Sequence, residues 1–317
     1  MQKNEMLASV VIPTFNRKEK IAQLLHSLNN QTISSRKYEV IVIDDGSTDG
    51  TKKIIKKIKP KLIYLKQKNR GPAAARNEGI KKAKGKVIVF LDSDMIAGRN
   101  LLEEHLKMHE KNEKIITRGN IKWLPKYKKN PFSEFAEKTT IMLGAMPIEE
   151  GELHWRLFLT CNASIKRNVL LKNPFDESFK KPAGEDLELS YRLHKKGYKI
   201  VFAKNAIAWH DREFDLKEFK KDVDLFINEA LLPICKKHPD CKEYEKIVEE
   251  AKSMDLHKIK NKIWLTEKAI EILEKKYRKN KIKEELFALY DGLESWHMFY
   301  ALNNALKKPN IKRNNRY

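Results

Sequence analysis

The sequence predicts an α/β domain with a mostly parallel sheet, followed by a helical C-terminal domain. Over the first ninety residues, short apolar runs alternate with segments of helical spacing, whereas helical spacing alone continues beyond about residue 215. Runs that are apolar at every position indicate strands buried on both faces, as in parallel sheets whose strands are joined by helices. We therefore expect an α/β domain over residues 1–214 and a helical domain over residues 215–317.

Four apolar runs mark the first expected strands. They are residues 9–12, 40–43, 62–65 and 87–91. Between the first two runs, apolar residues from Ile21 to Leu28 repeat at helical spacing. Thr48 or Asp49 can cap the next helix. An Ala-rich helix is expected over residues 73–84.

The second half of the chain is expected to contain two more strands and then helices only. The strands are predicted near residues 198–202 and 206–209. Amphipathic helical spacing follows in three sets, with Pro233, Pro239 and Asp291-Gly292 as the expected breaks. The three sets cover residues 216–230, 263–277 and 282–300.

The composition is strongly basic, with a formal net charge of +22. Such a charge favours encounters with phosphates, nucleic acid or an anionic membrane face, but a lysine-rich proteome produces it as well. The three cysteines cannot all pair and no apolar stretch is long enough for a membrane span, so we expect a cytoplasmic protein. The helical C-terminal part is expected to pack on itself, to form a homodimer, or to touch the inner face of the cell membrane.

Acidic residues follow two of the expected strands. Asp92-Ser93-Asp94 comes directly after residues 87–91, and Asp44-Asp45 comes after residues 40–43. Ligands of parallel α/β sheets bind beyond the carboxyl ends of the strands. Two carboxylates separated by one residue suit Mg²⁺ or Mn²⁺, and Asp45 can accept hydrogen bonds from a nucleobase or a ribose. The alternative for both clusters is turn and helix-cap chemistry.

Three further positions carry candidate polar groups. Arg76 lies in the small-residue segment 69–77, where it can hold a phosphate; the alternative is close helix–sheet packing with a solvated arginine. Glu185-Asp186 begins a helix, where a carboxylate can act as a general base or simply favour the helix dipole. His210 ends an expected strand and is either a metal ligand or a hydrogen-bonded imidazole.

The order of these motifs carries more information than any one of them. Val-Ile-Pro-Thr-Phe-Asn-Arg (11–17) precedes Asp-Asp-Gly-Ser-Thr-Asp (44–49), Asn-x-Gly-x-x-x-Ala-Arg-Asn (69–77) and Asp-Ser-Asp (92–94). In this order they resemble the family 2 glycosyltransferases of the GT-A fold. Phe-Asp-Glu-Ser-Phe (175–179) and Gly-Glu-Asp-Leu-Glu-Leu-Ser-Tyr-Arg-Leu (184–193) resemble the acceptor half of chondroitin polymerase and galactosyltransferase-like enzymes. The resemblance covers about residues 7–210.

The resemblance implies a binding site for a nucleotide-sugar donor. By position, Pro13 and Thr14 contact the nucleotide through their backbone, Asp45 faces the base, and Arg76 supports the phosphates. The implied donor-site residues are Pro13, Thr14, Asn16, Arg17, Asp45, Gly71, Arg76, Asp92 and Ser93. A UDP-sugar is the expected donor, with guanosine and thymidine nucleotides as alternatives.

The resemblance also implies a metal site and a general base. Asp94 is the expected direct ligand of Mn²⁺ or Mg²⁺, Asp92 lies near the ribose or the metal's water shell, and His210 completes the site. Asp186 is the expected general base of an inverting displacement. Glu185 is expected to contact the acceptor or the donor sugar.

The expected function is therefore metal-dependent transfer of a sugar to a glycan or a lipid-linked saccharide, in polysaccharide biosynthesis. Lys181-Pro182-Ala183-Gly184 stands where these relatives usually have Trp-Gly-Gly, so the identity of the sugar stays open. The alternatives are a sugar nucleotidyltransferase, a nucleic-acid-binding protein and a catalytically silent scaffold of the same fold. No specific nucleic acid is expected as a partner, because no DNA- or RNA-binding module is recognisable.

Overall fold

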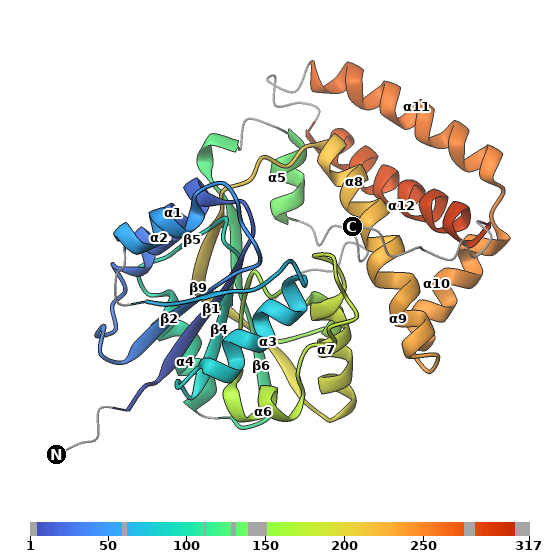
Figure 1. Ribbon diagram of the computed structural model, residues 1–317. Helices are drawn as coiled ribbons and strands as arrows, with labels where there is room; N and C mark the ends of the chain where they lie inside the picture. The colour runs from blue at the N-terminus through green and yellow to red at the C-terminus, as the bar shows by residue number, and fades with distance from the viewer. Residues whose placement is uncertain are drawn as a thin grey trace. The chain divides into compact units, whose positions relative to one another are not determined.

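The elements of the protein form two compact units in the computed structural model (Figure 1). The structure describes residues 5–58, 62–110, 112–127, 131–138, 151–275 and 283–307. The first unit comprises Met1–Lys128 with Pro147–Glu213, and the second comprises Lys129–Met146 with Phe214–Tyr317. The functional boundary at residue 214 stays a prediction. The compact units differ from it mainly by assigning Lys129–Met146 to the C-terminal unit.

The first unit is an α/β structure built on one sheet. Its strands are β1 (Ala8–Thr14), β2 (Tyr38–Asp44), β3 (Ile63–Lys66), β4 (Val87–Leu91), β5 (Met95–Ala97), β6 (Ile115–Trp123), β7 (Glu152–Leu153), β8 (Asn162–Lys166) and β9 (Lys199–His210). Its α-helices are α1 (Lys18–Leu28), α2 (Thr51–Ile58), α3 (Pro72–Lys82), α4 (Leu101–Glu110), α6 (Arg167–Lys172) and α7 (Glu185–Lys195). Short 3₁₀ turns lie at Pro125–Tyr127 and Trp155–Leu157.

The sheet has the strand order β3-β2-β1-β4-β8-β6-β9-β5, with β7 paired to β9. Strands β1 to β4 run parallel, as the four apolar runs predict, and β8 then pairs antiparallel to β4. The carboxyl ends of β1, β2 and β4 therefore meet at one edge, together with the amino end of β8. This edge is the expected ligand-binding edge of such a sheet.

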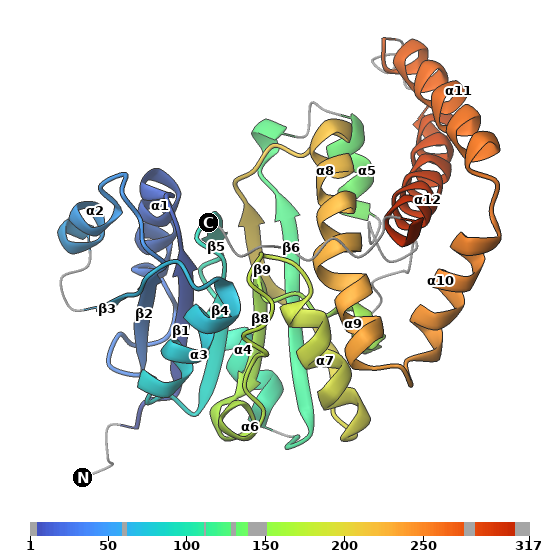
Figure 2. The same ribbon diagram turned by 45° about the vertical axis from the view of Figure 1, so that its right-hand side comes forward.

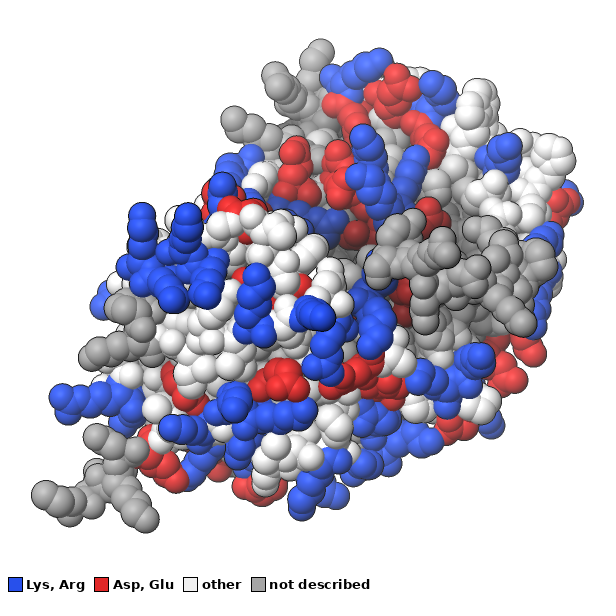
Figure 3. Space-filling model, viewed as in Figure 1, with Lys and Arg blue, Asp and Glu red and all other residues white. Residues whose placement is uncertain are grey.

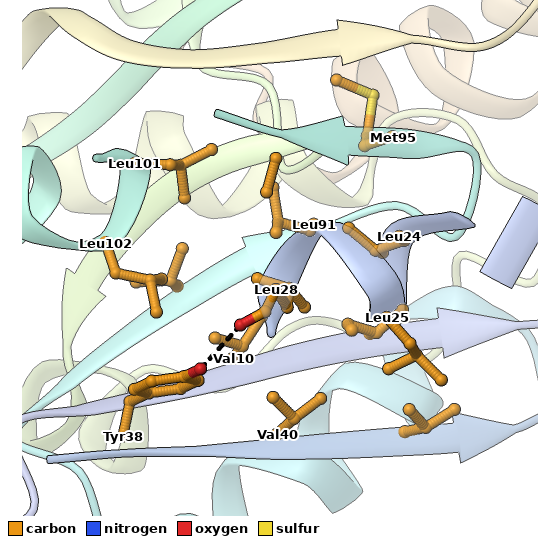
Figure 4. Packing of buried hydrophobic residues seen from close by; sticks show 14 of the residues in the cluster. Val10, Leu24, Leu25, Leu28, Tyr38, Val40, Leu91, Met95, Leu101 and Leu102 are labelled. Atoms are coloured by element: carbon orange, nitrogen blue, oxygen red, sulfur yellow. Dashed lines mark hydrogen bonds between the residues drawn. The ribbon is translucent and has the colours of Figure 1, made fainter. Parts of the chain in front are cut away.

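One face of the sheet packs against α1, α2 and α4. Leu24, Leu25 and Leu28 of α1 recur at helical spacing and are buried against strand residues such as Val10 and Val40 (Figure 4). Tyr38 also lies in this core, where its hydroxyl donates a 2.6 Å hydrogen bond to the carbonyl oxygen of Leu28. Its polar atom is thereby satisfied within an apolar cluster.

The other face of the sheet is covered by α3, and α6 and α7 lie on the same side (Figure 2). The alanines of α3 are buried, and a Cβ added to Gly79 would lie 2.5 Å from Cγ1 of Val11. Small side chains therefore allow α3 to approach β1 and β2 closely. The small-residue segment 69–77 thus contributes helix–sheet packing, which was the alternative expected from its sequence.

The two strands expected at 198–202 and 206–209 form a single strand, β9. Its pairing with β6 shifts register between Gly119 and Asn120, which leaves a bulge between Ala203 and Ile207. The Asn162 side chain donates to the Ala206 carbonyl at 2.8 Å, so a carbonyl of the bulge is satisfied. The bulge allows one strand to continue where the sequence pattern is interrupted.

The second unit is helical, as expected for the C-terminal part. Its helices are α5 (Pro131–Lys138), α8 (Leu216–Phe226), a π-helix (Ile227–Leu231), α9 (Leu232–Lys237), α10 (Lys242–Ser253), α11 (Leu256–Glu274) and α12 (Lys283–Lys307). Helix α5 belongs here because Phe132 packs its ring against those of Phe214, Phe219 and Tyr290. Among the described residues, no helix is both long and apolar enough to cross a membrane.

One of the expected helix breaks is wrong, whereas another coincides with an interruption of the α-helical pattern. Asp291-Gly292 lies inside α12, where Leu286, Tyr290 and Leu293 are fully buried. Their burial outweighs the cost of a glycine in a helix, which is about 1 kcal/mol. Pro233 lies at the start of α9, directly after the π-helix, where its missing amide hydrogen is tolerated. The expected helical residues Tyr277 and Ile282, and the segment 139–150, lie outside the described residues.

Candidate active site

A cavity of about 510 Å³ opens at the carboxyl ends of β1, β2 and β4. With the exception of Asn16, the cavity is lined by every residue that was predicted to bind the donor, to bind the metal or to act as the general base. Those lining residues are Pro13, Thr14, Arg17, Asp45, Gly71, Arg76, Asp92, Ser93, Asp94, Glu185, Asp186 and His210. A larger hollow of about 620 Å³ lies where β1 and β4 begin, away from all of the motifs. The 510 Å³ cavity is therefore the candidate active site.

Asp94 and His210 form a pair at one side of this cavity. The Asp94 Oδ1 atom lies 3.4 Å from Nε2 of His210, because β5 and β9 pair with Met95 opposite His210. Arg17 Nη1 lies 3.9 Å from the other oxygen of Asp94. Burial alone raises the pKa of Asp94, but His210 and Arg17 outweigh it and lower the pKa to about 2. The carboxylate is thus ionised at neutral pH.

The ring of His210 is held from its other side as well. Trp123, which pairs with it in the β6–β9 ladder, stacks on it with ring centroids 5.0 Å apart and an interplanar angle of 6°. The next residue, Asp211, is 2% exposed and binds Lys20 through a 2.6 Å ion pair. Its backbone amide donates to the Asp94 carbonyl at 2.8 Å. These contacts fix the imidazole next to Asp94.

Arg76 joins two carboxylates that come from distant parts of the chain. Its side chain is 3% exposed, and its Nη1 donates to Oε1 of Glu185 at 2.7 Å. Its Nη2 donates to Oδ1 of Asp92 at 2.9 Å. Arg76 lines the cavity, but its terminal nitrogens face carboxylates, whereas the sequence suggested phosphates. Its position therefore supports a role in holding Asp92 and Glu185.

Asp186 lies in the first turn of α7, which begins after the left-handed residue Gly184 (φ 87°). The Asp186 Oδ1 atom accepts a 2.8 Å hydrogen bond from the Leu187 amide. Burial raises the pKa of Asp186, and Arg76 opposes this only in part. A half-buried carboxylate with a raised pKa, lining a cavity, has the properties of a general base.

Asp45 organises the loop that precedes α3. One carboxylate oxygen accepts from Gln67 Nε2 at 2.7 Å and from the Arg70 amide at 2.8 Å, and the other accepts from the Gly71 amide at 2.9 Å. The Asp45 carboxylate, which was expected to face the nucleobase, therefore already accepts three hydrogen bonds from the chain itself. The carboxylate still lines the cavity and is 6% exposed.

Asn16 has a supporting place outside the cavity lining. It adopts a positive φ of 51°, its amide donates to Oγ of Ser47, and its side-chain oxygen accepts from the Thr48 amide. Asn16 thereby ties the segment after β1 to the segment after β2. An asparagine suits this position because it tolerates left-handed backbone better than most residues.

Sequence reasoning missed several residues that line the cavity. Phe15 is 44% exposed although it is aromatic, and it lies inside the motif 11–17. Thr160 and Cys161 enter from the amino end of β8. Lys180 and Lys181 enter from the loop before α7. One sequence signal pointed to this loop: Lys181-Pro182-Ala183-Gly184 stands where similar enzymes usually have Trp-Gly-Gly.

The loop before α7 lies directly against Gly71. A Cβ added to Gly71 would lie 2.4 Å from the carbonyl oxygen of Lys180, and Gly71 has φ 90° and ψ 168°, a conformation essentially restricted to glycine. We expect Gly71→Ala to displace the Lys180 loop and to lower the melting temperature more than Gly50→Ala does. Gly50 is the matched control, because it has φ 91° but nothing within 4 Å of the added Cβ.

Differential scanning fluorimetry of the two variants measures this difference. Both variants place a side chain at a positive φ, where residues other than glycine are strained, and the steric clash adds to this strain only at Gly71. Equal shifts in the two variants would show that the Lys180 loop does not restrict position 71.

Comparison with known proteins agrees with this fold. The model of glycosyl transferase family 2 matches residues 9–169, which is half of the chain, so the chain belongs to that family. An uncharacterized glycosyltransferase of Bacillus subtilis, YfnE, is 29% identical in an alignment of 255 residues, and the match covers 65% of this chain. The chain spans 64% of the length of YfnE. The prediction of a family 2 glycosyltransferase is confirmed.

Two solved structures share the fold at low sequence identity. The mannosyltransferase PcManGT from Pyrobaculum calidifontis, in complex with GDP-Man and Mn²⁺, superposes with a TM-score of 0.58 at 16% identity, covering 96% of this chain and 88% of that one. S. aureus TarS 1-349 in complex with UDP gives a TM-score of 0.52 at 18% identity, covering 95% and 91%. The predicted GT-A fold, including helices after the sheet, is confirmed.

Proposed function

We propose that this chain transfers a sugar from a nucleoside-diphosphate donor to a hydroxyl group of a saccharide acceptor, with inversion at the anomeric carbon. The observation that carries the proposal is the convergence of Asp94, His210 and Asp186 on one cavity. The first two residues supply an anionic and an imidazole ligand, and the third supplies a base. These are the groups that transfer from a diphosphate leaving group to a hydroxyl requires.

Unsatisfied polar atoms in the cavity wall support the proposal. The Thr14 hydroxyl, Nε of Arg76 and Oε2 of Glu185 are buried without a hydrogen-bond partner among the described residues, and all three residues line the cavity. A buried polar atom without a partner costs about 1–3 kcal/mol. A polar ligand with hydroxyl and phosphate groups is able to satisfy such atoms, whereas an apolar ligand is not.

The residues present fit a divalent cation that takes part of its coordination from a substrate. Asp94 and His210 offer two ligands, and Asp92 is engaged by Arg76. Within the described ranges, no three His, Cys, Asp or Glu side chains gather closely enough to hold a metal by themselves. We propose Mn²⁺ or Mg²⁺ at the Asp94–His210 pair, where it supplies positive charge to the leaving diphosphate.

The chemistry of the chain's own residues follows from their positions. Asp186 accepts the proton of the acceptor hydroxyl as the hydroxyl oxygen forms a bond to the anomeric carbon. The bond between that carbon and the diphosphate oxygen breaks on the opposite face, and the nucleoside diphosphate departs with the electron pair. Arg17 adds positive charge beside the departing phosphates. One displacement of this kind inverts the configuration.

We also propose which nucleotide the donor carries and which class of acceptor receives the sugar. UDP is the nucleotide in the TarS complex and GDP-Man is the donor in the PcManGT complex, so both nucleotides occur on this fold. We propose a UDP-sugar, because the family resemblance implies that Asp45, which lines the cavity, faces the nucleobase. A glycan or a lipid-linked saccharide is the proposed acceptor.

A thermal-shift screen tests the proposal directly. UDP-, GDP- and dTDP-sugars are each added with and without Mn²⁺ or Mg²⁺, since a ligand that binds the folded state raises the melting temperature with its concentration. We expect one nucleotide to stabilise the protein, and to do so more strongly with metal. No shift with any donor, from folded protein, would favour a catalytically silent scaffold instead.

A further inference from the structure

Helix α11 presents large apolar side chains to solvent. Trp264, Leu265 and Ile272 are 58%, 59% and 56% exposed, although single exposed apolar residues are usually scattered. They are three of the five large hydrophobic residues that are exposed in the described part of the chain. We call these three residues, which lie within nine positions of one helix, the α11 face.

The aliphatic residues of the α11 face point away from the core of its own unit. Ile259, Ile263 and Ile270 are the buried residues of the helix. With about 100° between successive residues, Leu265 and Ile272 lie on the side opposite these isoleucines. Trp264 lies at the border of the packed side, where it lines a hollow together with Lys220 of α8 and Tyr300 of α12. The aliphatic residues of α11 therefore form two separate sides, and only one of them is used for packing within the unit.

Lysines surround the α11 face. Lys258 and Lys268 lie on the same side of the helix as the apolar residues, and Lys275 follows its end. Figure 3 shows uncharged surface over α11 next to Lys and Arg side chains, with Asp and Glu side chains among them. The one glutamate on this side, Glu271, is paired with Lys268 at 3.1 Å and with Lys275 at 3.6 Å.

The other glutamates of α11 are engaged by neighbouring helices. Glu267 pairs with Lys220 and lies 3.1 Å from His297, and Glu274 accepts a hydrogen bond from the hydroxyl of Tyr290. Glu267 and Glu274 therefore contact neighbouring helices, and Glu271 is neutralised by lysines in or directly after its own helix. The outer side keeps a net positive charge around its apolar centre.

We propose that the α11 face docks on the surface of an anionic lipid bilayer, with Trp264, Leu265 and Ile272 at the boundary between headgroups and acyl chains. Exposed tryptophan and aliphatic residues bordered by lysines are the features of helices that lie in this boundary. A second copy of the same face is a poor partner, because its lysines repel those of the first. This proposal stands independently of the sugar-transfer reaction.

The test is co-sedimentation of the full chain with lipid vesicles. We expect binding to vesicles that contain phosphatidylcholine and phosphatidylglycerol, and much weaker binding to phosphatidylcholine alone. The variant Trp264→Ala/Leu265→Ala/Ile272→Ala should lose about tenfold or more in partition coefficient, since it removes most of the inserted apolar area. Leu171→Ala is the matched control, because Leu171 is 49% exposed on α6, in the other unit.

A charge variant tests the electrostatic half separately. Lys258→Gln/Lys268→Gln should weaken binding to the anionic vesicles, whereas Lys53→Gln/Lys56→Gln on α2 removes the same charge elsewhere and should have little effect. All four substitutions are at exposed positions, so both variants are expected to fold. Failure of the wild-type chain to sediment with anionic vesicles would overturn the proposal. The proposal would also be overturned if the apolar triple variant bound the vesicles as well as the wild type does. A wild-type dimer that this variant abolishes would overturn it too.

Discussion

Asp186→Asn is expected to lower kcat by about 10²- to 10⁴-fold, the range that a positioned general base contributes. Asparagine keeps the size of the side chain and its bond to the Leu187 amide, but it cannot accept the proton of the acceptor hydroxyl. Donor binding should persist, because Asp94, His210 and Arg17 are unchanged. Single-turnover transfer and the donor-induced thermal shift together measure the two properties.

The pH dependence of the same reaction gives a second readout of Asp186. Its pKa is raised by burial, so the base loses its charge at a higher pH than an ordinary aspartate. Activity should therefore rise with pH through an apparent pKa above the ordinary value of about 3.9, and the residual activity of Asp186→Asn should lack this rise. A variant with wild-type kcat would exclude Asp186 as the base.

Asp94→Asn is expected to abolish the metal-dependent part of donor binding. The wild-type carboxylate is ionised at neutral pH, since its pKa lies near 2, and the substitution removes the only negative charge of the Asp94–His210 pair. Loss of a directly bound carboxylate should weaken donor affinity in Mn²⁺ by about 100-fold or more, beyond the 10- to 100-fold typical for residues that only support a ligand. Isothermal titration with nucleotide, with and without Mn²⁺, measures the effect.

The control for this experiment is Asp224→Asn, which removes one carboxylate from an exposed position on α8. It should titrate like the wild type. If Asp94→Asn also titrates like the wild type in the presence of Mn²⁺, Asp94 is not a metal ligand and the proposed metal site must be reassigned.

The sheet and the location of the cavity could be predicted from the sequence. Strand runs such as residues 40–43 and 87–91 are apolar at every position, so their parallel pairing and the meeting of their carboxyl ends follow from general rules. The carboxylates after these strands, Asp45 and Asp94, thereby reach one cavity. The ordered motifs then identified the family without any structural information.

The contacts of individual side chains could not be predicted in the same way. Arg76 and Glu185 are 109 positions apart, and their pairing depends on where the tertiary structure places the start of α7 relative to α3. The continuity of α12 through Gly292 depends likewise on burial of Tyr290 and Leu293, which local sequence preference does not reveal. Rules of periodicity describe elements, whereas these features arise from tertiary packing.

The contact of Arg76 with both Asp92 and Glu185 also has a consequence for folding. The donor-side motif after β4 and the acceptor-side motif at the start of α7 share one counter-ion, which is almost completely buried. If the segment at the start of α7 detached, Arg76 would lose its buried partner Glu185 and keep only Asp92, whose side chain is 37% exposed, and the loss of a buried partner is destabilising. Opening of the two motif segments is therefore cooperative, so a partly unfolded molecule that retains only the donor half of the cavity is disfavoured.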